Sequence, residues 1–146
     1  MSWISITEDL VKTRLTGAEL TALKTAALAS GQTGVLADVI GGVVKEWRGR
    51  IRRWHPLAAG ATLPDELEHH VLAVIRYRLF TRLPGMKGLL DELRVKEYDA
   101  AMKAQGELQD MAFEAPATPD TAAAGVPTPA FNVLDREQSR DQQNGL

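Results

Sequence analysis

The chain has 146 residues, with 17 basic and 19 acidic residues and a formal net charge of −2. This length favours a single domain, and the nearly neutral charge gives no global argument for binding to nucleic acid or to a membrane. The sequence contains no cysteine, which excludes a disulfide framework and thiol chemistry and fits a reducing compartment.

Membrane insertion is not expected. The longest apolar run, at residues 39–44, is far shorter than the roughly 20 residues that span a bilayer. The N-terminal residues lack the basic region and the long apolar core of a signal peptide. We therefore expect a soluble chain without a membrane partner.

The composition changes at Phe113. Residues 1–113 are rich in Leu, Val, Ile and Arg, whereas residues 114–129 consist largely of Ala, Pro and Thr. Repeated prolines prevent a continuous helix and favour an extended, solvated backbone. We therefore predict a helical domain over 1–113 and an extended C-terminal arm over 114–146, which cannot bury a core of its own.

The domain reads as helices throughout, with N-caps at Thr7 and Thr16 and a capping box between Thr16 and Glu19. The predicted helices cover residues 8–15, 17–29, 33–54, 64–80 and 87–111, with a break at Pro84-Gly85. No stretch shows a convincing two-residue period. The predicted fold is all-α, a compact bundle of about five helices with an extended Pro/Ala-rich C-terminal arm.

The last three predicted helices carry apolar residues, and in the third these recur at intervals of three and four, the period of one helical face. In the third helix they are Val35, Leu36, Val39, Ile40, Val43, Val44, Trp47, Ile51 and Trp54. In the fourth they are Leu67, Val71, Val74, Ile75 and Leu79, and in the fifth Leu90, Leu93, Tyr98, Ala101, Met102, Leu108 and Met111. We expect these residues to face the core.

Gly41 and Gly42 lie inside the third predicted helix, where each costs about 1 kcal/mol relative to alanine. One interpretation is a close helix–helix contact. The other is a bend that lets the helix adapt to its neighbours.

No catalytic or metal-binding pattern stands out. His69 and His70 lie near Glu66 and His55, but adjacent histidines on a helix point in different directions, and no cysteine or histidine at the right spacing completes a site. The Gly31-Gln-Thr-Gly34 segment lacks the lysine and spacing of a phosphate-binding loop. We predict no enzymatic activity, no metal and no cofactor.

A basic cluster ends the third predicted helix. Its members are Lys45, Arg48, Arg50, Arg52 and Arg53, which with Glu46 give a local charge of five minus one, or +4. Arg76, Arg78 and Arg82 add positive charge on the next helix. The cluster is either a solvated face that complements the helix dipole or a surface for phosphates or an acidic partner.

Four segments, in this order, resemble the small head–tail connector (adaptor, or head-completion) proteins of tailed bacteriophages, in particular the Mu-like prophage group. They are Ile6-Thr-Glu-Asp-Leu-Val11, Trp47-Arg-Gly-Arg-Ile-Arg-Arg-Trp-His-Pro-Leu57, Leu63-Pro-Asp-Glu-Leu67 with Ala73-Val-Ile-Arg-Tyr-Arg-Leu-Phe80, and Ser139-Arg-Asp-Gln-Gln-Asn-Gly-Leu146. The Ala/Pro spacer is longer than in that pattern, so the helical segments carry the resemblance better than the terminal one.

The resemblance implies a structural virion protein, present in the host cytoplasm during assembly and then at the head–tail interface. Such subunits form a ring, usually of twelve, that extends the DNA channel below the portal. Expected partners are further copies, the portal protein, and a tail terminator or the next neck protein, with non-specific contact to genomic DNA. Phe131, Val133, Leu134, Arg140 and Asp141 would dock the arm on a neighbour or on the portal. The alternative is a small helical DNA-binding regulator.

Overall fold

The computed structural model describes residues 2–29 and 31–114. The chain divides into two units, Met1–Pro116 and Ala117–Leu146, and the described residues belong to the first. The predicted docking residues of the arm, Phe131, Val133, Leu134, Arg140 and Asp141, lie outside the described residues.

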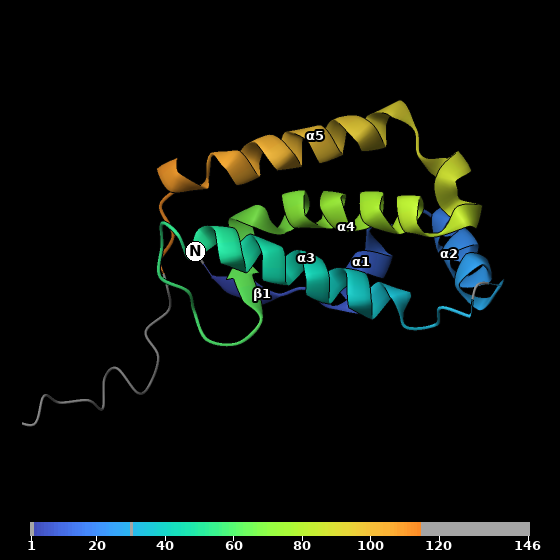
Figure 1. The fold of residues 1–146 in the computed structure, drawn as a ribbon, viewed down its shortest axis with the longest axis horizontal. Coiled ribbons are helices and arrows are strands. Elements are labelled where there is room, and N and C mark those ends of the chain that lie inside the picture. The colour runs from blue at the N-terminus through green and yellow to red at the C-terminus, as the bar shows by residue number, and fades with distance from the viewer. Residues whose placement is uncertain (1, 30, 115–146) are drawn as a thin grey trace, which may run out of the picture. The chain divides into compact units, whose positions relative to one another are not determined.

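The described residues form an all-α bundle, as predicted (Figure 1). The α-helices are α1 (Glu8–Thr13), α2 (Gly17–Ala29), α3 (Val35–Ile51), α4 (Glu68–Arg82) and α5 (Glu92–Gly106). The shorter elements are the strands β1 (Trp3–Ser5) and β2 (Thr62–Pro64) and the 3-10 helices η1 (Asp65–Leu67), η2 (Pro84–Leu89) and η3 (Leu108–Asp110).

The N-terminal helices begin at the predicted caps. The Thr7 hydroxyl accepts a hydrogen bond from the Leu10 amide at 3.2 Å. In the capping box, the Glu19 amide donates to the Thr16 hydroxyl at 3.2 Å and the Thr16 amide donates to the Glu19 carboxylate at 2.7 Å. These contacts satisfy amides that have no partner inside the helix.

Helix α4 lies between α3 and α5 (Figure 1). Because it packs against neighbours on more than one side, its buried set is wider than a single stripe and includes Leu72, Ala73 and Phe80. All five predicted inward residues from Leu67 to Leu79 are buried, and so are Val39, Val43 and Trp47 of α3.

Several predicted helix boundaries are wrong. Helix α3 ends at Ile51, so Trp54 lies in the turn that follows and is 57% exposed. The fourth helix does not begin at Pro64, which belongs to β2, because a 3-10 turn precedes α4. A single helix was predicted over residues 87–111, but the structure has three separate elements there, η2, α5 and η3.

Local signals explain the division of that last segment. The side chain of Asp91 accepts a hydrogen bond from the Arg94 amide, so it caps a new helix after η2. Ala101 and Leu108 are buried as predicted. Leu93 is 61% exposed, because the shorter helix places it in the first turn, on the side away from the core.

A small sheet was missed by the sequence analysis. Strand β1 pairs with β2 antiparallel, with Trp3 opposite Pro64, Ile4 opposite Leu63 and Ser5 opposite Thr62. The Trp3 indole donates a 2.7 Å hydrogen bond to the Glu114 carbonyl. The last described residue is therefore held beside the first strand.

Candidate functional site

The predicted basic cluster divides into two groups in the structure. Lys45, Arg50, Arg52 and Arg53 are exposed, and none of the four forms an ion pair with the residues described. We call these four side chains the α3 basic face. Their charges are available to a partner.

Arg48 does not belong to this face. Its guanidinium donates hydrogen bonds to the carbonyls of Ala58, at 2.9 Å, and Thr62, and both contacts are partly buried. Arg48 therefore ties the 55–61 loop and β2 to α3. Backbone carbonyls occupy its terminal nitrogens within the domain, and the expectation that Arg48 faces a partner stays a prediction.

Arg76 and Arg78 do not enlarge the exposed cluster either. Arg78 forms a 2.6 Å ion pair with Glu46, and Arg76 forms a 2.9 Å ion pair with Glu97. Arg82, in the last turn of α4, is exposed. These ion pairs between helices could not be predicted from the sequence, because the two partners of each pair lie far apart in the chain.

The acid within the cluster is already matched. Burial would raise the pKa of Glu46, but hydrogen bonds from Arg78 and Gln105 outweigh it, so the pKa lies below its ordinary value. Glu46 is thus a carboxylate whose charge Arg78 compensates. The α3 basic face (Lys45, Arg50, Arg52 and Arg53) carries four positive charges, and that of Arg50 also lowers the pKa of Glu46.

Helix geometry places part of this face on one stripe. Lys45 and Arg52 are seven residues apart, so they lie on the same side of the helix and about 10 Å apart along its axis. Gly49 lies between them on that stripe and is exposed. Without a side chain at Gly49, a flat or extended partner can approach the backbone closely.

The two inner glycines of α3 do not serve packing within the domain. A Cβ atom built on Gly41 or Gly42 would meet no atom within 4 Å. The interpretation as a close helix–helix contact is therefore wrong among the described residues. The alternative, a bend that adapts the helix, stays a prediction.

The histidines have structural surroundings. The Nε2 atom of His55 lies 2.8 Å from the Leu108 carbonyl, and its ring meets Phe113 edge-on at 5.0 Å. The rings of His69 and His70 lie 3.8 Å apart, and burial together with His69 lowers the pKa of His70. Within the described ranges, no three His, Cys, Asp or Glu residues are placed to hold a metal.

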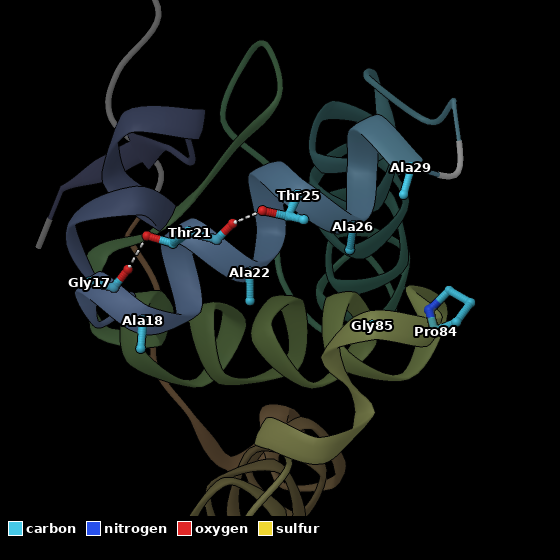
Figure 2. A pocket seen from close by; sticks show the side chains of 9 residues that line it. All are labelled: Gly17, Ala18, Thr21, Ala22, Thr25, Ala26, Ala29, Pro84 and Gly85. Carbon is cyan, nitrogen blue, oxygen red and sulfur yellow. Dashed lines mark hydrogen bonds between the residues drawn. The ribbon is translucent and has the colours of Figure 1, made fainter.

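Two concave surfaces were not predicted. One is a cleft of about 390 Å³ between α3 and the loop before β2, with Gly41 and Lys45 in its lining. We call it the Gly41 cleft. The other is a groove of about 920 Å³ along α2, which Figure 2 shows with Pro84 and Gly85 on the segment after α4.

Small, mostly apolar residues line the α2 groove, so the helix surface is both hollowed and apolar there. Ala18, Ala22 and Ala26 lie along one side of the helix (Figure 2), and a Cβ atom on Gly85 would lie 3.4 Å from the Ala26 side chain. The hydroxyls of Thr21 and Thr25 donate to carbonyls one turn earlier in α2, at 2.9 and 3.0 Å. The spacing of small residues in α2 was the sequence signal for this groove.

No helix among the described residues is long and apolar enough to cross a membrane. Comparison with known proteins finds no family model, no curated protein and no solved structure that matches this chain.

Proposed function

We propose that this chain is a structural virion protein, a subunit of a ring at the portal vertex that joins a phage head to its tail and extends the DNA channel. Its partners are further copies of the chain, the portal protein and the tail terminator or next neck protein. The observation that carries the proposal is the α3 basic face, whose four exposed cations form no ion pair with the described residues.

The charge pattern of the α3 basic face favours binding of a polyanion over a purely structural role within the domain. The domain pairs its partly buried arginines with acids, as in Arg78–Glu46 and Arg94–Glu19. Four like charges left within three turns repel one another, and phosphates would relieve that repulsion. The dipole of α3 also favours cations at its C-terminal end, which explains one or two of them but not the whole set.

The same residues argue against sequence-specific recognition of DNA. Base edges are read by short polar side chains and by arginines placed in the major groove by a recognition helix. The exposed stripe of α3 offers a glycine and long cations. Contacts of this kind hold the phosphate backbone regardless of base sequence, as a DNA passage requires.

The arm supplies the second part of the proposal. Residues 114–146 contain five acids and two bases, a net charge of −3, opposite in sign to the α3 basic face. We assign Phe131, Val133 and Leu134 as apolar anchors and Arg140 and Asp141 as polar contacts on the portal or an adjacent subunit. Such a joint holds a ring together through terminal segments that bind a neighbouring subunit.

The test measures DNA binding by the full chain as a function of salt concentration. Changing Arg50, Arg52 and Arg53 together to Gln should weaken binding and reduce the slope of log K against log salt by up to about three, since each phosphate contact contributes about 0.9. The matched control changes Lys12, Lys96 and Lys103 to Gln. It removes the same charge from lysines that pair with acids on their own helices.

The control variant should bind DNA with the slope of the unmodified chain. Equal losses in the two triple variants would show that net charge alone, and not the α3 basic face, attracts DNA. A preference for one operator that survives high salt would contradict the proposal and favour a DNA-binding regulator.

A further inference from the structure

The lining of the Gly41 cleft is mostly apolar and includes two basic side chains. Ile6 from the segment after β1, Ile40 and Val44 from α3, and Gly60 from the loop before β2 line it. Lys45 also lines it and forms no ion pair with the described residues. Arg48 is the second basic residue of the lining, and its terminal nitrogens are held by carbonyls.

Gly41 keeps this cleft open. Glycine inside a helix costs about 1 kcal/mol relative to alanine, and no neighbour in the domain would obstruct a side chain at this position. Any larger residue at 41 would extend into the cleft that Gly41 lines. The absence of a side chain is therefore useful to an occupant from outside the domain.

The lining defines the chemistry of that occupant. Apolar side chains match the remaining exposed surface of Ile6, Ile40 and Val44, which are 8%, 8% and 5% exposed, because apolar surface gains by leaving water. A carboxylate close behind them would meet Lys45 and the charge of Arg48. The matching ligand is a short apolar segment followed directly by an acid.

The chain itself contains such a segment. Residues 131–135 read Phe-Asn-Val-Leu-Asp, with Phe131, Val133 and Leu134 before the carboxylate of Asp135. We propose that the Gly41 cleft of one copy receives residues 131–135 of a neighbouring copy. This inference rests on the proposed self-assembly and names the site and the segment that join two subunits.

The chain is long enough for this contact. The described domain ends at Glu114, which is bound to Trp3. The step from Glu114 to Phe131 is 17 residues, which spans about 50 Å at about 3.1 Å per residue when extended. A domain of this size has a radius of gyration of roughly 13 Å, so the segment can reach the next copy.

The contact also has the symmetry of a ring. The donated segment and the receiving cleft are different surfaces, so each copy gives one contact and takes another. Heterologous contacts of this kind close into rings when the rotation between copies allows it.

Disulfide trapping between two full-length copies tests the inference, because the natural sequence has no cysteine. One copy carries Ala61→Cys in the lining of the cleft. A second copy, made longer by a fused tag, carries Asn132→Cys between the anchors. Oxidation of the mixture should give a crosslinked pair of unequal chains. A copy with Asp99→Cys, on the exposed surface of α5, replaces the first copy as the background control.

Two leucine variants separate docking from random collision. Gly41→Leu in the receiving copy fills the cleft and should lower the yield about tenfold, the change produced by about 1.4 kcal/mol. Gly42→Leu is the matched control, since Gly42 is exposed, open to a Cβ atom and absent from the lining. It should keep the full yield.

Three outcomes would overturn the inference. They are a yield no higher than the Asp99→Cys background, equal yields from the two leucine variants, and a crosslink that forms only when both cysteines are on one chain. The DNA measurement does not involve the cleft. Failure here with an intact salt slope would reject this joint alone, whereas failure of both would reject the proposed function.

Discussion

The buried carboxylate of Glu19 and the partly buried guanidinium of Arg94 form a two-pronged ion pair that joins α2 to α5. The Nη2 atom of Arg94 lies 2.9 Å from Oε1 and 3.2 Å from Oε2, and its Nε atom lies 3.2 Å from Oε1. The side chain of Arg94 is 13% exposed and that of Glu19 is 8% exposed. Burial would lower the pKa of Arg94, but its bonds to Glu97 and Glu19 outweigh this and raise it.

Arg94→Leu should destabilise the domain by about 3 kcal/mol, because it leaves the buried charge of Glu19 without its main partner. Adding Glu19→Gln should recover much of that loss, since glutamine can keep the capping contact to Thr16 without a charge. Denaturant unfolding of the two single variants and the double variant measures the coupling.

Lys96→Leu is the matched control for that cycle. Lys96 pairs with Glu92 on the same helix, but these side chains are 70% and 83% exposed. Its loss should cost less than about 1 kcal/mol. Equal costs for Arg94→Leu and Lys96→Leu would contradict a role of the buried pair in joining the helices.

Acid should destabilise the domain in part through Glu46. Since the folded pKa of Glu46 lies below its ordinary value, its stabilising effect is present above the ordinary pKa and is lost as the pH falls through the folded pKa. The free energy of unfolding, measured from about pH 6 down to about pH 3, should fall less steeply for Glu46→Gln. Glu107→Gln, at an exposed acid, is the charge-matched control for this comparison.

A second titration falls at higher pH. The pKa of His70 is lowered in the fold, so the folded state favours the neutral ring and stability falls as the pH drops below the ordinary histidine value of about 6.5. His70→Gln should remove this part of the curve and leave the Glu46 part in place. An unchanged curve above about pH 5 would contradict this assignment.

Core packing predicts a contrast between Ile75 and Leu28. Ile75 in α4 is fully buried, whereas Leu28 at the end of α2 is 72% exposed. Ile75→Ala should cost about 2–5 kcal/mol, as for other large-to-small changes in cores. Leu28→Ala should change stability by less than about 0.5 kcal/mol. Thermal and denaturant unfolding measure both, and similar losses would contradict the assigned core.

Sequence patterns predicted the helical bundle because its main signals are local. The three- and four-residue period of α3 and α4 and the caps at Thr7 and Thr16 depend on neighbours within a few positions. The sheet between β1 and β2 could not be predicted in this way. Each strand has three residues, too few to show a period, and their pairing joins residues about 60 positions apart.

The basic character of the candidate site could be predicted from the sequence, but the residues that belong to it could not. The run from Lys45 to Arg53 was recognisable as basic. However, whether an arginine is free or paired depends on distant partners, such as Ala58 and Thr62 for Arg48 and Glu46 for Arg78. The Gly41 cleft is likewise formed by three separate segments, so the glycine pair alone suggested an internal contact that the fold does not contain.

Removal of residues 128–146 should separate folding from assembly. The described core is complete without these residues, so helicity and the melting temperature should stay almost unchanged. The same deletion should yield heads that fail to join tails, because the proposed anchors are lost. Normal incorporation and infectivity of the truncated chain would contradict the proposed role of the arm.

The most direct test of the proposed ring is electron microscopy of tailed particles whose copies of this chain carry a small tag. The account predicts tag density at the vertex between head and tail, in a closed ring whose α3 basic face lines the DNA passage. Absence of the chain from purified particles, or tag density away from that vertex, would contradict it.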